Sequence, residues 1–262
     1  MSADAADKRP NVVAVVQARM PSTRLPDKVL ADIAGRPMVW RVVDRVRQAR
    51  QVDQVVVATS TQDPDRPIEA FCLKEGIDCH RGELKDVLDR YYRAAVRYGA
   101  DAVVRVTADC PLIDPDVIDR AVDIFQQGDY DFVSNVETPT YPDGLDVEVF
   151  SSETLEKTWR DASWESEREH VTTHMKLPGR FRTLNFVNDV DLSHLRWTVD
   201  EPQDMEFVRA VYKRLDDQRF TMADVLALLE REPELSVINS GFDRNEGLQK
   251  SLTEDRLIDV ER

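Results

Sequence analysis

The 262-residue sequence is poor in cysteine and in positive charge, and it has no long apolar run. Three cysteines, an odd number without C-x-x-C spacing, argue against a disulfide framework or a structural zinc site. The 35 Lys and Arg residues against 50 Asp and Glu residues give a net charge of −15, which excludes nucleic acid and anionic membranes as expected partners. No stretch approaches the roughly eighteen apolar residues of a membrane span. Residues 1–10 are polar where a signal peptide would be basic and then apolar, so the cytoplasm is the expected compartment.

What the sequence does contain is a regular alternation of apolar runs and amphipathic segments. Val12–Gln17 is a continuous apolar run, and similar runs recur at Gln54–Ala58 and Ala102–Val106. Such runs are typical of strands that are buried on both faces of a parallel sheet. Helical patterns lie between and after them, at Pro37–Ala49, Pro67–Glu75, Leu84–Tyr98 and Pro115–Gln127. The alternation predicts βαβ units and a doubly wound, mainly parallel α/β sheet.

Beyond residue 127 the pattern loosens into shorter elements. Strands in a small mixed β extension are expected at Asp131–Ser134, Leu145–Phe150, Arg182–Phe186 and Leu195–Val199. Helices are expected at Glu165–Met175, Gln203–Leu215 and Thr221–Arg231. We predict a disordered lead over residues 1–10, one α/β domain over residues 11–220, and a helical C-terminal appendage over residues 221–262 that is available to a partner subunit.

The loop after the first apolar run carries the strongest chemical signal. Its sequence is QARMPSTRLPDK, and it contains three cations and two hydroxyls, Arg19, Arg24, Lys28, Ser22 and Thr23. Open α/β sheets bind ligands at the carboxyl ends of their strands, where this loop lies. Arg offers a planar fork and Lys a point charge to phosphate oxygens, so the loop is suited to a triphosphate, with a solvated basic loop as the alternative. Neither G-x-G-x-x-G nor a Walker A sequence is present, so side chains would replace a glycine-rich backbone.

The longer run QARMPSTRLPDKVLADIAGRPM resembles the opening motif of the CMP-sugar synthetases, the cytidylyltransferases that make CMP-KDO and CMP-sialic acids. It is most similar to the SpsF-type branch of spore coat polysaccharide biosynthesis. Further similar motifs follow in order, ATSTQDPDRPI, RGELKDVLDRYYRAA, RVTADCPLID, YPDGLDVEVFS, SEREHVT, RWTVDEPQDMEFV and NEGLQKSL. The resemblance runs from Val12 to about Leu252. It implies a Rossmann-like, GT-A-like fold, a homodimer, and transfer of CMP from CTP with release of pyrophosphate.

The resemblance also implies a set of nucleotide contacts. In the first loop these are Ala18, Arg19, Met20, Ser22, Arg24 and Lys28, with Arg24 and Lys28 as catalytic cations. After the second strand, Thr59, Ser60 and Asp63 would lie near the cytosine and the ribose. Further along the chain, the matching contact positions are Gly82, Asp86, Arg90, Thr107 and Asp109.

Two aspartates that follow strands are candidates for a magnesium site. Asp109 comes after Ala102–Val106, and Asp200 comes after Leu195–Val199. Magnesium prefers one or two carboxylates together with phosphate oxygens and water. The metal site of the family matches these positions, so Mg²⁺ is the implied cofactor and both aspartates are implied in catalysis. For Asp200 the alternative is an ordinary helix cap before Pro202. Cys110 is expected to be a small buried residue, because no histidine is adjacent to it.

Two short motifs are candidates for binding the acceptor. Asp143 and Gly144 belong to a tight turn, and Asp146 and Glu148 share one face of the strand that follows. These acids would bind sugar hydroxyls or assist the metal, and an exposed polar sheet face is the alternative. On the helix that follows, two residues are singled out, Arg168 and His170. The arginine could hold a carboxylate or phosphate, and the histidine could orient or deprotonate a hydroxyl, with a structural histidine as the alternative.

These observations favour magnesium-dependent transfer of CMP from CTP to a small anionic acceptor: a sugar acid, a sugar phosphate or a phosphonate. One rival is a nucleotide-sugar-dependent glycosyltransferase, because Asp189-Val190-Asp191 fits the D-x-D metal motif of those enzymes, although an ordinary turn is the better interpretation. Another rival is a non-catalytic nucleotide-binding partner subunit, in which NEGLQKSL would be a docking arm.

Overall fold

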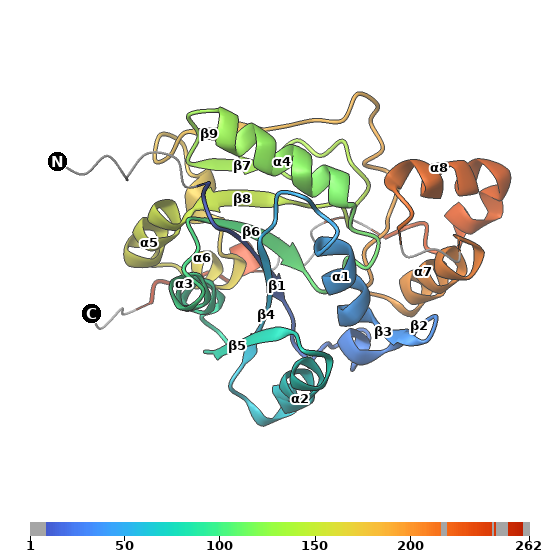
Figure 1. The fold of residues 1–262 in the computed structure, drawn as a ribbon, viewed down its shortest axis with the longest axis horizontal. Coiled ribbons are helices and arrows are strands. Elements are labelled where there is room, and N and C mark those ends of the chain that lie inside the picture. The colour runs from blue at the N-terminus through green and yellow to red at the C-terminus, as the bar shows by residue number, and fades with distance from the viewer. Residues whose placement is uncertain (1–8, 216–218, 243, 245–250, 259–262) are drawn as a thin grey trace.

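The computed structural model describes residues 9–215, 219–242, 244 and 251–258. In that part of the chain seven strands form one sheet in the order β5-β4-β1-β6-β8-β7-β9 (Figure 1). Their bounds in that order are Asp78–Gly82, Gln54–Ser60, Val12–Gln17, Ala102–Thr107, Glu148–Ser151, Phe132–Ser134 and Thr183–Asn185. The first four strands are parallel, β8 runs antiparallel to both of its neighbours, and β9 is parallel to β7. The predicted fold class, a mainly parallel α/β sheet with a mixed extension, is confirmed.

Eight α-helices surround the sheet within the described residues 9–215 and 219–242, and residues 251–253 are also helical. They are α1 Met38–Val46, α2 Arg66–Glu75, α3 Val87–Arg97, α4 Pro115–Gln127, α5 Ser152–Asp161, α6 Glu165–His170, α7 Pro202–Leu215 and α8 Met222–Arg231. A small hairpin of β2 (Asp32–Ile33) and β3 (Arg36–Pro37) precedes α1. No helix among the described residues is long and apolar enough to cross a membrane.

The alternation of side chains along β1 explains why helices lie on both faces of the sheet. Val12, Ala14 and Val16 belong to a core cluster that includes residues of α1, α2, α4, α7 and α8. Val13 and Val15 belong to a second cluster with residues of α3 and α5. All five side chains are fully buried, because successive residues of a strand point to opposite faces and both faces are covered here.

Polar caps start several of the helices where the sequence places them. Asp114 accepts a hydrogen bond from the backbone N–H of Asp116 at 2.8 Å, and Pro115 occupies the first turn of α4. Ser151 caps α5 in the same way through the N–H of Thr154, at 3.0 Å. These local signals fix where the chain leaves the sheet.

The structure corrects several expected elements. Residues 195–199 form no strand and contribute only an isolated bridge between Arg196 and Asp143. The helix expected over Glu165–Met175 ends at His170, because the next residue has a φ of 64°, and a short 3-10 segment follows. Strands β2, β3 and β5 and helix α5 were not expected. The segment expected as strand Leu145–Phe150 pairs only over Glu148–Ser151. Most of the predicted lead and of the NEGLQKSL motif lies outside the described residues.

Candidate functional site

The first loop is fastened to the end of the neighbouring strand by a buried carboxylate. Asp65 is fully buried and accepts a hydrogen bond from the backbone N–H of Met20 at 2.7 Å. Its other oxygen accepts a hydrogen bond from the hydroxyl of Ser60, the last residue of β4. Ala18 also donates its N–H to the carbonyl of Ala58, at 3.0 Å. The loop therefore continues from β1 in a defined path along the carboxyl edge of the sheet.

At the end of this loop the side chain of Lys28 points into the protein. Its Nζ lies 3.2 Å from Asp109, 2.8 Å from Asp200 and 2.7 Å from the carbonyl oxygen of Val199. Burial disfavours the ammonium charge, but the attraction of the two carboxylates outweighs it and raises the pKa of Lys28. The same pairing lowers the pKa of Asp109 in spite of that residue's burial. The structure thus brings both aspartates expected at the metal site to one point.

Further cations surround the Asp200 carboxylate. Arg24 Nη2 lies 3.1 Å from it and Arg196 Nη2 lies 3.4 Å from it. Near the start of α7, Asp204 accepts hydrogen bonds from the backbone N–H groups of Asp200 and Glu201, each at 2.9 Å. The Asp200 carboxylate itself pairs with Lys28, Arg24 and Arg196, so its side chain faces the cations of the site.

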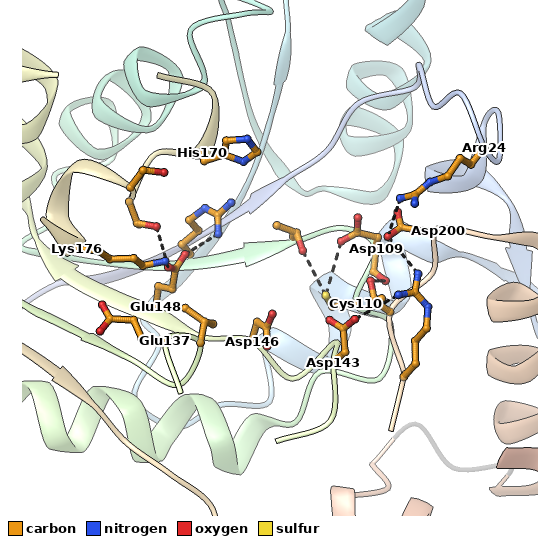
Figure 2. Close-up of a pocket in the computed structure, with 17 residues that line it drawn as sticks. Arg24, Asp109, Cys110, Glu137, Asp143, Asp146, Glu148, His170, Lys176 and Asp200 are labelled. Carbon is orange, nitrogen blue, oxygen red and sulfur yellow. Dashed lines mark hydrogen bonds and ion pairs between the residues drawn. The ribbon is translucent and has the colours of Figure 1, made fainter. Parts of the chain in front are cut away.

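Two cavities meet at the Asp109–Asp200 pair. The first has a volume of about 460 Å³ and is lined mainly by the first loop. The second, of about 530 Å³, extends toward β8 and α6 (Figure 2). Both are lined by Arg24, Thr107, Asp109 and Asp200. We call them the loop cavity and the β8 cavity. Two ligands, one in each, would touch at the carboxylate pair.

The structure separates the expected nucleotide contacts into two groups. Among the described residues that line the loop cavity are Ala18, Arg19, Ser22, Arg24, Lys28, Thr107 and Asp109. The other expected residues line neither cavity: Met20, Thr59, Ser60, Asp63, Gly82, Asp86 and Arg90.

The second group has structural contacts of its own. Thr59 and Ser60 are fully buried, and Asp63 is exposed and pairs with Arg66 at 2.8 Å. Asp86 caps α3 through the N–H of Asp89, at 2.8 Å. A Cβ on Gly82 would lie 3.2 Å from Cγ of the buried Arg90, so that glycine packs closely on α3.

The β8 cavity contains four of the six residues expected at the acceptor, Asp143, Asp146, Glu148 and His170 (Figure 2). Glu148 is only 2% exposed, so the alternative of an exposed polar face is wrong for this residue. Its carboxylate lies 2.6 Å from Arg105 and 2.7 Å from Lys176. Burial acts against ionisation, but these two cations prevail and lower the pKa of Glu148 to about 2.

Gly144 does not line the β8 cavity, but it sets the position of Asp143. Its φ is 110°, and a Cβ there would lie 2.6 Å from the backbone nitrogen of Thr198 and 2.7 Å from the carbonyl carbon of Trp197. Only glycine permits this approach. The turn can therefore lie against residues 195–198, where Asp143 pairs with Arg196 at 3.4 Å.

His170 and Arg168 leave α6 in different directions. His170 lines the β8 cavity, and burial, assisted by the nearby cations Arg105 and Lys176, lowers the pKa of His170 although Glu169 raises it. A lowered pKa keeps the imidazole neutral at pH 7, as a proton acceptor requires. Arg168 is buried, lines neither cavity and lies 3.5 Å from Asp86.

Two other motifs are explained by their surroundings. Burial raises the pKa of Cys110 well above its usual value, which matches the expected inert buried thiol. The residues of the D-x-D motif are exposed, and Asp191 accepts the N–H of Ser193 at 2.9 Å. The motif is an ordinary turn that lines neither cavity. It therefore no longer supports the glycosyltransferase alternative.

Sequence reasoning missed several residues that build the site: Asp65, Arg105, Lys176, Arg196, Asp204 and Arg244. One of them did carry a signal. Arg105 interrupts the apolar run AVVRV, and a cation inside a buried strand requires a buried partner. The partner is Glu148 on the adjacent strand, opposite Arg105 in the antiparallel register.

The site thus combines a cationic loop with two aspartates at the carboxyl edge of a mainly parallel sheet, where open α/β sheets bind their ligands. A model of the cytidylyltransferase family matches residues 13–232, and the chain belongs to this family. It is 30% identical over 235 residues to the spore coat polysaccharide biosynthesis protein SpsF of Bacillus subtilis, covering 86% of this chain and 96% of that protein.

Solved structures agree with this assignment. A cytidylyltransferase from Leptospira borgpetersenii is similar with a TM-score of 0.84 and 29% identity, over 90% of this chain and 100% of that one. A CMP:2-keto-3-deoxy-manno-octonic acid synthetase solved in complex with CTP shares the fold, with a TM-score of 0.60 and 20% identity over 78% of this chain and 99% of that one. The protein is a nucleotidyltransferase.

Proposed function

We propose that the protein transfers CMP from CTP to an oxygen of a small anionic, sugar-type acceptor and releases pyrophosphate. The observation that carries the proposal is the meeting of two cavities at the Asp109–Lys28–Asp200 junction. The loop cavity, lined by Arg19, Ser22 and Arg24, suits the triphosphate of the donor. The β8 cavity suits the acceptor. The similarity to a CMP:2-keto-3-deoxy-manno-octonic acid synthetase complexed with CTP and to a spore coat polysaccharide biosynthesis protein supports CTP as the donor and a sugar-type acceptor.

Asp109 and Asp200 fit a divalent cation as well as an ammonium. One Nζ atom already lies within 3.2 Å of both carboxylates, so a single cation can reach both. Among the described residues no group of three or more His, Cys, Asp or Glu side chains is placed to hold a metal. A site with two carboxylates completed by substrate phosphates is the arrangement that magnesium commonly adopts. When bound, Mg²⁺ would offset negative charge on the phosphate oxygens.

The side chains of the protein would then act by position and charge. The acceptor oxygen would attack the α-phosphorus in line with the leaving pyrophosphate. Lys28 and Arg24 would stabilise the charge that builds up on the transferred phosphate and the leaving group. His170 is neutral and lines the acceptor side, so it can take up the proton of the attacking hydroxyl.

Charge at the far end of the β8 cavity supports an anionic acceptor. Arg105 and Lys176 line that end together with the hydroxyl-bearing residues Thr172 and Thr173. These side chains can receive a carboxylate or a phosphate while Asp143 and Asp146 accept hydrogen bonds from hydroxyl groups. The homodimer and the cytoplasmic location expected from the sequence remain part of this proposal.

A thermal-shift panel with CTP, UTP, ATP and GTP, each with and without magnesium, tests the donor without knowledge of the acceptor. A ligand at one hundred times its dissociation constant stabilises the folded state by about 2.7 kcal/mol, a shift of a few degrees. We expect the largest shift for CTP with magnesium. Asp109→Asn and Asp200→Asn should each lose the magnesium-dependent part, and the exposed Asp161→Asn should retain it. The absence of any shift with triphosphates would overturn the proposal.

The acceptor is then found by pyrophosphate release in the presence of CTP and magnesium. The panel contains sugar acids, sugar 1-phosphates and phosphonates, with uncharged sugars as the control for charge. We expect turnover with one anionic class and none with the uncharged sugars. Transfer from a nucleotide sugar without use of CTP would instead support the glycosyltransferase alternative. Tight binding of CTP without turnover on any acceptor would support the non-catalytic partner subunit.

A further inference from the structure

Described residues that follow α8 in the sequence contact the protein at two places, beside the Asp200 region and at the start of α6. We call residues 238–242, 244 and 251–258 the C-terminal arm. On one side, Asn239 donates to the carbonyl oxygen of Arg196 at 2.8 Å and to the carboxylate of Asp204 at 2.9 Å. On the other side, Asp255 accepts the N–H of Ser166 at 2.9 Å and its hydroxyl at 2.6 Å. The arm is thus hydrogen-bonded beside the donor junction and at the start of α6.

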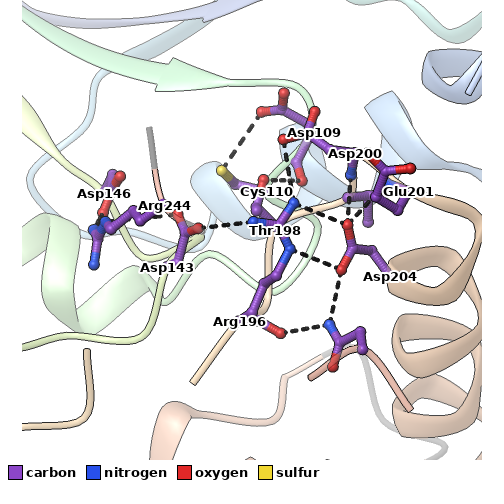
Figure 3. A network of polar contacts seen from close by, with 12 residues as sticks. Asp109, Cys110, Asp143, Asp146, Arg196, Thr198, Asp200, Glu201, Asp204 and Arg244 are labelled. Atoms are coloured by element: carbon purple, nitrogen blue, oxygen red, sulfur yellow. Dashed lines mark hydrogen bonds and ion pairs between the residues drawn. The ribbon is translucent and has the colours of Figure 1, made fainter. Parts of the chain in front are cut away.

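Between these two anchors, Arg244 reaches the acids of the β8 cavity (Figure 3). Its Nη2 donates to Asp146, its Nε lies 3.8 Å from Asp143, and its Nη1 donates to the carbonyl oxygen of Tyr141 at 3.3 Å. The side chain of Arg244 is only 15% exposed. All three contacts fall on one short loop, residues 141–146, which carries two acids of the cavity lining.

The negative charges of Asp143 and Asp146 are offset by nearby cations. Asp143 has Arg196 as a second partner at 3.4 Å, whereas the ion pairs of Asp146 among the described residues are confined to Arg244. The other charged groups that act on Asp146 are the acids Asp143 and Glu148, which repel it, and Lys176, which attracts it. The side chain of Asp146 is 31% exposed, and a half-buried carboxylate that loses its one close cation either takes up a proton or moves toward water.

We propose that Arg244 is a positioning residue of the acceptor half of the site: the C-terminal arm delivers its guanidinium behind Asp143 and Asp146 and thereby fixes the loop that receives the acceptor. Arg244 itself lines neither cavity, so it acts through the two acids. The assignment of the β8 cavity to the acceptor rests on the proposed function. The contact between the C-terminal arm and the loop at residues 141–146 is independent of that function.

Amide hydrogen exchange on peptides that cover residues 141–148 tests that link in the absence of any acceptor. Arg244→Gln removes the cation and should speed exchange there at least tenfold, and Arg244→Lys should give an intermediate rate. The matched control is Arg256→Gln, an exposed arginine on the same arm, which should leave the rate unchanged. Asp146→Asn should speed exchange as Arg244→Gln does, and the double variant should add little to either.

Kinetics then separate positioning from general loss of structure. With the acceptor that the panel identifies, Arg244→Gln should raise the acceptor KM at least tenfold, leave the KM for CTP within twofold, and retain the CTP–magnesium thermal shift. Unchanged exchange over 141–148 in Arg244→Gln would overturn the inference. The inference would also be overturned if Arg256→Gln speeded exchange over residues 141–148 equally, or if Arg244→Gln lost CTP binding as well. If wild-type protein shows no shift with CTP, the proposed function fails, while the exchange result still decides the inference.

Discussion

At the scale of single residues, the site consists of opposite charges that are already paired before a ligand binds. Lys28 is 8% exposed and joins two carboxylates from distant parts of the chain. Arg24 and Arg196 complete the set around Asp200. Paired charges of this kind are preorganised, so little rearrangement is needed when charge develops on a reacting phosphate.

Removal of the central ammonium should therefore affect turnover more than any other single change in the loop. Lys28→Met leaves two carboxylates close together without a shared cation, and it removes a positive charge from the lining of the loop cavity. The expected loss in kcat/KM is about 100- to 1,000-fold, measured as pyrophosphate release. Lys74→Met, on the exposed face of α2, is the matched control. A Lys28→Met variant within threefold of wild type would contradict this role.

The buried Glu148 should make stability depend on pH. Its pKa is lowered from 4.5 to about 2 by Lys176 and Arg105 acting against burial. A lowered pKa contributes stability that is present above pH 4.5 and is lost as the pH falls toward 2. The difference in unfolding free energy between wild type and Glu148→Gln should therefore shrink by about 2 kcal/mol between pH 7 and pH 3.

Urea denaturation of both proteins across this pH range measures the effect. Glu153→Gln, in the first turn of α5, serves as a control because that side chain is exposed. A difference between wild type and Glu148→Gln that stays constant with pH would show that folding does not shift the pKa of Glu148.

At the scale of elements, the first loop depends on a carboxylate outside it. Asp65 precedes α2 and accepts hydrogen bonds from the loop and from the end of β4. In Asp65→Asn, an amide N–H replaces one of the two acceptor oxygens, so one buried donor loses its partner at a cost of about 1–3 kcal/mol.

We expect the Asp65→Asn variant to bind CTP with magnesium about tenfold more weakly, since about 1.4 kcal/mol corresponds to a factor of ten. Calorimetric titration measures this affinity, and the exposed Asp161→Asn is the control. Because Asp65 lines neither cavity, full CTP affinity in Asp65→Asn would show that the loop keeps its path without this anchor.

The elements that could be predicted are those whose pattern is local. The strands β1, β4 and β6 appear as apolar runs, since both of their faces are buried. Strand β5, with the sequence DCHRG, lies at the edge of the sheet and is half polar, so no run marks it. Helix α5, SETLEKTWRD, buries Thr154, Leu155 and Thr158, so only one large apolar side chain marks its buried face. Conversely, residues 195–199 have the sequence pattern of a strand. In the structure they lie against the Gly144 turn and form one isolated bridge instead of a run of strand pairing.

At the scale of the whole molecule, the C-terminal arm connects parts that are distant in sequence. Deletion of residues 251–262 removes the hydrogen bonds between Asp255 and Ser166 and the bridge between Leu257 and Trp164. We expect the midpoint of thermal unfolding to fall by a few degrees, because about 1–3 kcal/mol of contacts at the start of α6 are lost.

Light scattering after size exclusion measures the oligomeric mass and so tests whether the arm contacts a second subunit. These contacts of the arm are made within one chain, so we expect the shortened protein to keep the oligomeric mass of the full chain. A change in mass with an unaltered unfolding midpoint would contradict this expectation and would favour the docking arm of the alternative interpretation.

The sequence by itself determined the class of fold, the cationic loop at the end of the first strand, and the two aspartates that the structure joins through Lys28. Each depends on patterns within some ten residues or on the resemblance of ordered motifs. Tertiary structure alone decided that Asp65 anchors the loop, that Glu148 is buried between cations, and that Arg244 reaches the acids of the β8 cavity. These contacts join segments that become neighbours only through packing, and a charged residue does not reveal in its local sequence which distant partner will offset its burial.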